Sequence, residues 1–386
     1  MPQPPVPPPR IRVSEAVMSD AEVDAVTRVI RSGRLSQGDR VLEFEHALGT
    51  LFGAPHVVAC NSGTAALHLA LLGAGVLPTD LVIVPALTYV ATANAVAYCG
   101  ASVVFADVDP DMWTIDHASV NEIVAWARKW RHPGSRTFVI PVDLYDSLAN
   151  TLSFTFTFDA EKVDGVILDA SHSMRTVSSA RATTFSFFPS KLITTGEGGA
   201  VLCSDPQVAA RMRLYRGQGT PATGKYHHTV IGYNYRMTEI AAAIGLAQLA
   251  NWPRPQLAYR RHLSDRYRAH LTGVPGIGLQ DPIAQSNGWA FAVTVPNSAD
   301  RVRERLAEDG IETRPFFEPL NGLPMYRESD RGDDSRRYRG AVAGFPTPVA
   351  YDLYRRGIVL PLHNLLTYLD VDHVCERLIA AVKETA

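Results

Sequence analysis

Lys191 is the residue of this chain with the clearest chemical potential. It follows an alternating apolar segment that carries Ser186, and Gly-Glu-Gly-Gly at residues 196–199 comes shortly after it. A lysine with apolar, glycine-flanked neighbours loses solvation as a cation, so its pKa falls toward the range where the neutral amine is a nucleophile. A lysine that forms Schiff bases needs this property. A lysine that extends its head group from a strand–loop junction would give the same pattern. The other four lysines have polar or charged neighbours: Lys129, Lys162, Lys225 and Lys383.

Pyridoxal 5'-phosphate (PLP) is a cofactor that such a lysine can hold. PLP also needs a phosphate cradle, an acid partner for its pyridine nitrogen and a face to stack on. Gly63 and Thr64 open an apolar-periodic helix, whose N-terminus favours an anion. Asp169 ends an apolar strand and could hold the ring nitrogen protonated, and Tyr89 follows another strand with an aromatic face. Each feature alone is more often a helix cap, a turn residue or a packing residue.

Together and in this order, these segments resemble the DegT/StrS-type sugar aminotransferases, within the fold type I PLP enzymes. The resemblance runs from about Leu35 to the C-terminus. It implies an α/β fold, with a large domain built on a mainly parallel sheet flanked by helices and a smaller C-terminal α+β domain. The most specific matches are residues 62–67, 101–109, 185–191, 196–199 and 232–239.

The resemblance assigns catalytic roles to three positions. Lys191 would bind PLP covalently and then move a proton between the substrate carbon and the cofactor. Asp169 would pair with the pyridinium nitrogen. His172 would lie near the phenolic oxygen of the cofactor, although a packed histidine is the alternative.

The resemblance also implies a phosphate site shared between subunits. Gly63, Thr64 and Ser186 would bind the cofactor phosphate. Asn234, with Arg236 beside it, would reach the phosphate of the partner subunit's cofactor. This arrangement implies an obligate homodimer with sites shared across the interface.

The implied reaction moves an amino group from glutamate to a nucleotide-linked keto sugar. Residues 226–249, 317–326 and 357–364 look most like perosamine-synthase-type enzymes, which act on GDP-linked 4-keto-6-deoxymannose. His363 is a candidate sugar or phosphate contact, with a structural turn as the alternative. Three other functions stay open: amination of another nucleotide-linked 3- or 4-keto sugar, amination of a non-sugar carbonyl such as a cyclitol or modified nucleobase, and a non-catalytic regulatory role.

Two segments depart from the family pattern. Residues 142–146 read Val-Asp-Leu-Tyr-Asp where relatives commonly read Val-His-Leu-Tyr-Gly, and residues 173–182 lack the glycines expected after Asp169. The whole segment 143–182 looks divergent, with Phe154, Phe156 and Phe158 alternating where a helix is expected. We expect altered loop geometry there with the chemistry retained.

Composition is typical of a cytoplasmic enzyme. The net charge of −2 and the pI near 6.6 give no bulk attraction to nucleic acid or to an anionic membrane. The four cysteines lie far apart without metal-ligand spacing, so we expect reduced thiols and no metal site. No apolar run approaches the ~20 residues that span a bilayer, and the N-terminus lacks the apolar core of a secretion signal.

Hydrophobic periodicity predicts alternating strands and helices. Continuous apolar runs favour strands buried on both faces, hence a parallel sheet. We place a domain boundary at Trp252–Pro253, which gives a Pro-rich tail (1–12), a PLP-binding large domain (13–252) and a small domain (253–386). The predicted strands are 81–85, 101–106, 137–142, 163–169, 183–188, 199–204 and 289–295. The predicted helices are 64–73, 88–98, 119–130, 237–250, 256–271, 299–309, 346–357 and 370–384.

Overall fold

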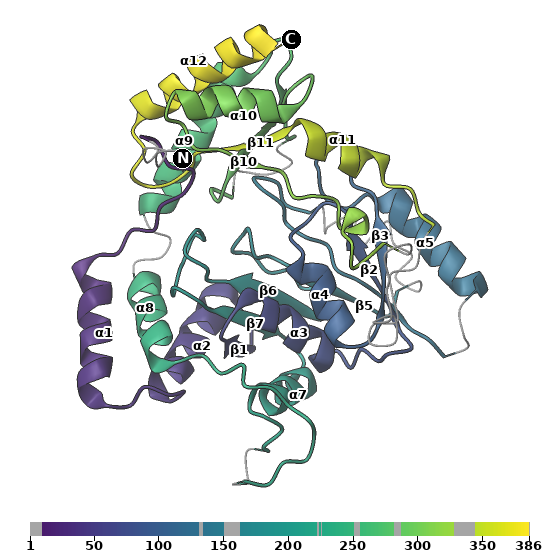
Figure 1. Cartoon of the computed structure of the whole chain (residues 1–386). Helices are drawn as coiled ribbons and strands as arrows, with labels where there is room; N and C mark the ends of the chain where they lie inside the picture. Colours follow the sequence, from purple (N-terminus) through teal and green to yellow (C-terminus); the bar gives the residue numbers. More distant parts are fainter. Residues whose placement is uncertain are drawn as a thin grey trace, which may run out of the picture.

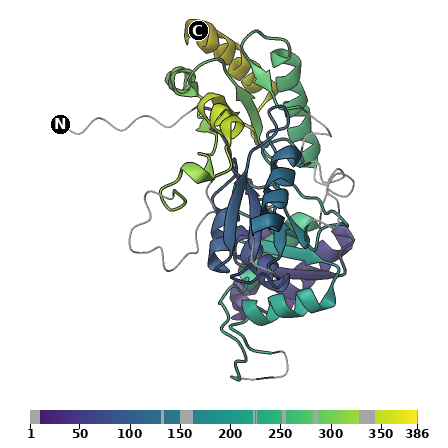
Figure 2. The same ribbon diagram turned by 90° about the vertical axis from the view of Figure 1, so that its right-hand side faces the viewer.

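The computed structural model describes residues 10–130, 134–149, 163–221, 224, 226–250, 255–281, 287–327 and 344–385. This part of the chain is organised around a seven-stranded and a four-stranded sheet. Figure 1 shows the smaller sheet and its helices above the larger sheet, and Figure 2 shows the same two parts from the side.

The larger sheet has the strand order β1-β7-β6-β5-β4-β2-β3. Strands β3, β2, β4, β5 and β6 run parallel to one another, whereas β7 pairs antiparallel with both β6 and β1. The predicted α/β class with a mainly parallel sheet is therefore confirmed. The strands are β1 (His56–Cys60), β2 (Leu81–Pro85), β3 (Ser102–Ala106), β4 (Thr137–Val139), β5 (Gly165–Asp169), β6 (Ala182–Ser186) and β7 (Gly199–Cys203).

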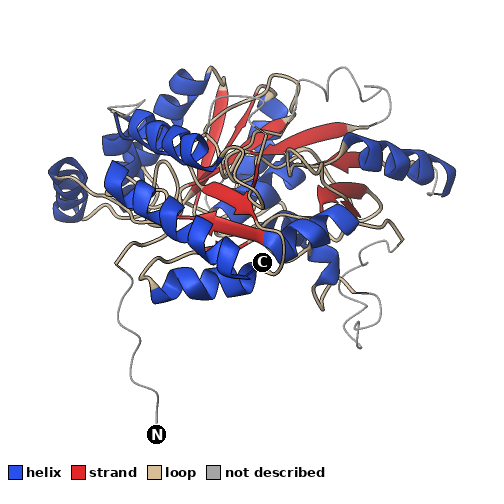
Figure 3. Cartoon of the chain, turned by 90° about the horizontal axis from the view of Figure 1, so that it is seen from above, coloured by secondary structure: helices blue, strands red, loops and turns tan. Residues whose placement is uncertain are grey.

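Helices lie on both sides of the strands, as seen from above in Figure 3. Helix α3 packs against α4 and α7, while α1 and α2 pack against α8. A Cβ at Gly245 would lie 2.5 Å from Cε2 of Phe44, so the small residue lets α8 approach α2 closely. The helices of the larger part are α1 (Asp20–Ser32), α2 (Asp39–Phe52), α3 (Gly63–Gly73), α4 (Ala91–Tyr98), α5 (His117–Trp130), α7 (Pro206–Arg216) and α8 (Glu239–Leu249).

The smaller sheet is antiparallel, with the order β10-β11-β9-β8. Its apolar core includes Leu263, Leu306 and Leu378, which come from the three helices α9, α10 and α12. The elements are α9 (Pro255–Leu271), β8 (Gly278–Leu279), β9 (Phe291–Thr294), α10 (Ala299–Glu308), β10 (Arg314–Pro315), the 3-10 helix η1 (Leu320–Gly322), α11 (Pro348–Arg356), β11 (Gly357–Leu360) and α12 (Tyr368–Thr385).

The first described residues join the smaller part before the chain reaches α1. The Ile11 N–H donates to the Gly310 carbonyl at 3.0 Å, and the Leu362 N–H donates to the Val13 carbonyl at 3.1 Å. The predicted tail lies mostly outside the described residues, as do the boundary at residues 252–253 and the alternating phenylalanines at 154–158. The division into domains at residue 253 stays a prediction.

Most predicted elements are present with small shifts at their ends. Strand 81–85 is β2 with the predicted bounds, whereas the strand predicted over 137–142 ends at Val139. No helix of the described residues is long and apolar enough to cross a membrane. The same part of the chain contains no cluster of three or more His, Cys, Asp or Glu side chains that could bind a metal ion.

Candidate active site

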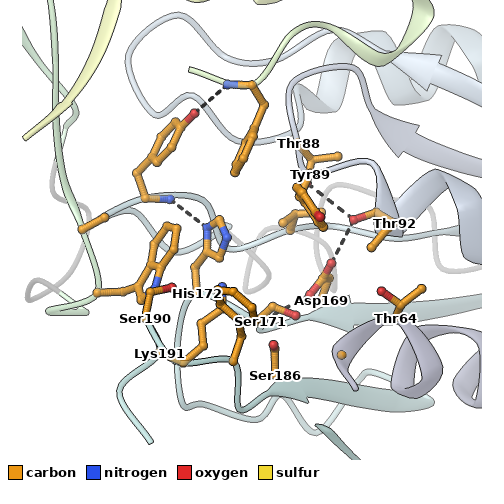
Figure 4. Close-up of a pocket in the computed structure, with 18 of the residues that line it drawn as sticks. Thr64, Thr88, Tyr89, Thr92, Asp169, Ser171, His172, Ser186, Ser190 and Lys191 are labelled. Atoms are coloured by element: carbon orange, nitrogen blue, oxygen red, sulfur yellow. Dashed lines mark hydrogen bonds between the residues drawn. The ribbon is translucent and has the colours of Figure 1, made fainter. Parts of the chain in front are cut away.

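The predicted cofactor residues meet at the carboxyl edge of the larger sheet. Asp169 ends β5, Ser186 ends β6, and Gly63 begins α3 beside them. Parallel strands end at the same edge, so residues far apart in sequence come together there. One cavity of about 600 Å³ opens at this edge, and Figure 4 shows its lining side chains. Seven predicted residues line it: Gly63, Thr64, Tyr89, Asp169, His172, Ser186 and Lys191.

Lys191 contributes an amine of unusually low basicity. Its Nζ lies 4.2 Å from the centroid of the Trp289 ring. Burial lowers the pKa of the Lys191 ammonium from 10.5 to about 7, an effect that the carboxylate of Asp169 opposes and the cation of Arg314 reinforces. A substantial part of the amine is therefore neutral at physiological pH and can act as a nucleophile.

Asp169 is a buried carboxylate held by two hydrogen bonds. The Thr92 hydroxyl donates to its Oδ2 at 2.9 Å, and the Ser171 N–H donates to its Oδ1 at 3.1 Å. Burial raises the pKa of Asp169, while both hydrogen bonds and the charge of Lys191 oppose this shift. A carboxylate desolvated in this way is a strong acceptor for a protonated ring nitrogen.

His172 is fixed as a neutral hydrogen-bond donor. Its Nδ1 lies 3.3 Å from the N–H of Tyr145 and must accept that hydrogen, so the ring proton resides on Nε2. Burial, reinforced by the charge of Lys191, lowers the pKa of His172 well below its usual range. The ring stacks on Trp289 with centroids 3.6 Å apart. Tyr145 is itself buried, and its hydroxyl accepts the N–H of Phe317 at 3.1 Å.

The N-terminus of α3 forms an anion cradle. Ser62 caps the helix by accepting the Ala65 N–H at 3.1 Å. The N–H groups of Gly63 and Thr64 have no partner within the described residues, as is usual for the first turn of a helix. A Cβ at Gly63 would lie 2.8 Å from Cβ of Ser186, so glycine is what lets the helix approach the end of β6. Two free amides beside two hydroxyl side chains suit a phosphate.

These groups fit the requirements of PLP. The cavity combines a nucleophilic amine, a buried carboxylate, a neutral histidine donor and an anion cradle. Tyr89 adds an aromatic ring, 55% exposed, whose centroid lies 5.7 Å from that of Phe317.

Asn234 and Arg236 do not line the cavity of their own chain. The carbonyl of Asn234 accepts a hydrogen bond from Asn61 at 3.3 Å, and Arg236 donates to Gln218 at 3.2 Å. Asn61 itself lines the cavity. Both predicted residues therefore belong to a loop beside the site.

His363 does not line the cavity, and both nitrogens of its ring are hydrogen-bonded to backbone groups. Its Nε2 lies 3.0 Å from the carbonyl of Arg12, and its Nδ1 accepts the N–H of Leu365 at 3.3 Å. Both ring nitrogens are therefore used and the side chain is buried. The alternative of a structural turn describes this histidine better than a sugar contact.

The cavity residues that the sequence did not predict include Thr92, Tyr145, Trp289 and Arg314. Thr92 lies one helical turn after Thr88, a spacing that could have identified it. Trp289 begins a predicted strand, and no role was predicted for its side chain. Arg314 comes from β10, two residues long, which carries little sequence signal.

A nucleophilic lysine, a buried strand-end carboxylate and a helix N-terminus at the edge of a mainly parallel sheet define a fold type I PLP enzyme. Residues 17–379 match the DegT/DnrJ/EryC1/StrS aminotransferase family, and the chain belongs to it. It is thus a PLP-dependent aminotransferase that acts on sugars.

Three known proteins illustrate the relationship. The chain is 34% identical to a GDP-perosamine synthase of Caulobacter vibrioides, over 96% of this chain and 98% of that protein. It is 33% identical to a dTDP-3-amino-3,4,6-trideoxy-alpha-D-glucose transaminase of Streptomyces venezuelae, over 79% of this chain and 80% of that protein. The chain also matches a solved structure, the PLP form of the putative sugar aminotransferase Spr1654 from Streptococcus pneumoniae. The TM-score is 0.83 and the sequence identity 25%, over 97% of this chain and 99% of that chain.

Proposed function

We propose that this enzyme moves an amino group from glutamate to a nucleotide-linked 4-keto-6-deoxy sugar, and that this sugar is GDP-4-keto-6-deoxymannose. The observation that carries the amino transfer is a lysine with a pKa of about 7 that shares a cavity with the buried carboxylate of Asp169. The choice of sugar rests on the similarity to the GDP-perosamine synthase of Caulobacter vibrioides.

Each cavity residue then has a task in the transfer. PLP, when bound, supplies the electron sink for the reacting carbon. Asp169 would hold the ring nitrogen protonated, and His172 would donate its Nε2 hydrogen to the phenolic oxygen. Lys191 would hold the cofactor covalently and, once released, take and return the proton at the reacting carbon, because its amine is neutral near pH 7.

Arg314 is the second cation of the site. Lys191 and Arg314 are the only Lys and Arg side chains among the described residues that line the cavity. The γ-carboxylate of glutamate and the diphosphate of a 4-keto sugar nucleotide each lie several bonds from the reacting carbon. One exposed guanidinium could therefore bind both anions in turn. We assign this role to Arg314.

A homodimer with shared sites is also part of the proposal. The described part of segment 217–236 (residues 217–221, 224 and 226–236) projects from the body of the molecule below α7 in Figure 1. It exposes Tyr226 and Ile231 to 88% and 91%, an apolar exposure that a partner subunit would cover. Asn234 and Arg236 lie on this segment, where they could reach the partner's cofactor phosphate. We place the dimer in the cytoplasm, in keeping with the four free cysteines.

A panel of acceptors tests the proposed substrate. The enzyme, PLP and glutamate are incubated with the GDP-, dTDP- and UDP-linked 4-keto-6-deoxy sugars, and the amino sugars are quantified by mass spectrometry. We expect the GDP-linked mannose derivative to be preferred. The free keto sugar should be a very poor acceptor, because the nucleotide orients the sugar.

Other outcomes of the panel point elsewhere. Equal turnover of all three would remove the choice of GDP-4-keto-6-deoxymannose and leave a sugar aminotransferase of broader range, as the similarity to the dTDP-sugar transaminase would allow. No amino sugar from any of them, with glutamate still converted to 2-oxoglutarate, would favour a 3-keto sugar or a non-sugar carbonyl.

A further inference from the structure

The N-terminal segment of residues 10–15 forms part of the cavity wall, far in sequence from the residues that would hold the cofactor. Val13 and Ser14 line the cavity. The Val13 N–H donates to Oε2 of Glu312 at 3.1 Å, and the Val13 carbonyl accepts the N–H of Leu362 at 3.1 Å. Hydrogen bonds of this kind tie down a terminal segment that would otherwise move. Ser14 is therefore held at the cavity by the backbone of its neighbour and not by its own side chain.

The hydroxyl of Ser14 contacts Arg314, the residue assigned above to the anions of both substrates. Nη2 of Arg314 donates to Oγ of Ser14 at 3.2 Å. This is the only hydrogen bond that either side chain makes within the described residues. Ser14 is half-buried and Arg314 is exposed, and both line the cavity. Most donors of the guanidinium and the hydrogen of the hydroxyl are therefore free to bind a ligand there.

Arg314 also sets the direction of the Ser14 hydroxyl. A guanidinium carries donors and no acceptor, so the hydroxyl cannot donate back to it and its hydrogen points away from the guanidinium. Nothing in the described part of the chain accepts that hydrogen. An anion that binds beside Arg314 would meet a second donor that is already oriented, which lowers the cost of forming the hydrogen bond.

We propose that Ser14 is a substrate-binding residue, whose hydroxyl donates a hydrogen bond to the same oxyanion that Arg314 binds. This inference rests on the function proposed above. The oxyanion is the γ-carboxylate of glutamate in one half-reaction and the diphosphate of the sugar nucleotide in the other. Each has several lone pairs and can accept from a guanidinium and a neighbouring hydroxyl at the same time. A neutral hydroxyl adds a hydrogen bond without adding charge, so each anion can still leave before the next substrate enters.

The first experiment measures both half-reactions in Ser14→Ala, which removes the hydroxyl and keeps the backbone contacts of the segment. Stopped-flow absorbance of the cofactor follows glutamate with the PLP form and the keto sugar with the pyridoxamine form. We expect kcat/KM to fall about 10-fold for both substrates, through weaker binding and not through a slower limiting rate. A loss with only one substrate would assign Ser14 to the anion of that substrate alone.

Two further variants separate the hydroxyl from other effects of substitution. Ser14→Thr keeps a hydroxyl and should stay within about threefold of the wild type in both half-reactions. Ser204→Ala is the matched control, because Ser204 is exposed and does not line the cavity. Its rates should be unchanged.

An uncharged donor substrate isolates the anion. Glutamine carries an amide in place of the γ-carboxylate, so Ser14→Ala should change its kcat/KM less than about threefold. A double-mutant cycle then tests the shared subsite: once Arg314→Met is present, adding Ser14→Ala should also cost less than about threefold.

Three results would overturn the assignment. They are unchanged rates of Ser14→Ala with both substrates, equal losses with glutamate and glutamine, and a loss that is the same with and without Arg314. The failure of the proposed function looks different, because the wild type would then aminate no nucleotide sugar while its glutamate half-reaction proceeds. In that case the glutamate rate alone decides the role of Ser14, and an unchanged rate in Ser14→Ala rejects it.

Discussion

Arg175 and Asp143 form a bidentate ion pair beneath the active-site loops. Nη2 of Arg175 lies 2.6 Å from Oδ1 of Asp143, and Nε lies 2.8 Å from Oδ2. The Asp143 side chain is completely buried and also accepts the Ala149 N–H and the Ser173 hydroxyl. Asp143 stands where the family pattern has histidine, and Arg175 lies in the stretch that lacks the expected glycines. The two segments in which this sequence differs from the family pattern are therefore joined by one ion pair.

This pair joins the two loops that hold His172. One loop carries Tyr145, whose N–H bonds to His172, and the other follows Asp169 and carries His172 itself. The ion pair explains how the divergent sequence can keep the histidine in place. Residues 150–162, between the two loops, lie outside the described residues.

The first prediction concerns the stability that this pair provides. Arg175→Met leaves a buried carboxylate without its cation, so the free energy of unfolding should fall by about 3–5 kcal/mol in urea denaturation. Arg266→Met is the control, because Arg266 pairs with Asp372 at a more exposed site, where solvent screens the ion pair, and its loss should cost far less stability. Equal losses in the two variants would contradict a structural role for the buried pair.

The second prediction concerns the pH dependence of PLP capture by the apo enzyme. Burial lowers the pKa of Lys191 to about 7, and only the neutral amine attacks PLP. The rate of capture, followed by absorbance, should rise as the pH rises through about 7 and then level off. A lysine model peptide should continue to gain rate up to its ordinary pKa. Borohydride should fix the cofactor on Lys191, as seen by peptide mass spectrometry, and a rate that keeps rising to pH 10 would refute the lowered pKa.

The third prediction concerns the support of Asp169. Asp169→Ala should bind PLP weakly and lose nearly all turnover, because an unprotonated ring is a poor electron sink. Thr92→Val removes one hydrogen bond to Oδ2 of Asp169 and should reduce kcat by about tenfold. Thr27→Val, at an exposed helix position, should have no effect on kcat. Near-normal turnover of Asp169→Ala would show that another group holds the ring nitrogen.

The fourth prediction concerns the shared sites. Lys191→Ala and Asn234→Ala should each be inactive. If Asn234 completes the neighbour's site, a mixed dimer contains one site with both residues intact and one with neither. Mixing the two variants should then restore part of the activity. Lack of recovery, with subunit exchange demonstrated by native mass spectrometry, would mean that one chain builds each site.

The elements around the cofactor site could be predicted well from the sequence. The apolar run of β2 and the periodic helix that follows Gly63 are local patterns, because burial on both faces or on one helical face dictates the residue types. The antiparallel strand β7 was expected as a strand, but its direction depends on partners elsewhere in the chain. Strands as short as β8 and β10 have too few residues to show any period.

The sequence by itself determined the chemistry: Lys191, Asp169 and Gly63 are recognisable because each lies in a local pattern that its role requires. The tertiary structure decided which other residues share the cavity. Trp289 and Arg314 come from the smaller part of the molecule, and they reach the site through contacts between segments that are distant in sequence. The same packing set the pKa of Lys191 and paired Asp143 with Arg175. The apolar sequence neighbours of Lys191 predicted that its pKa falls, but the extent of its desolvation and the ion-pair partner of Asp143 depend on neighbours in space.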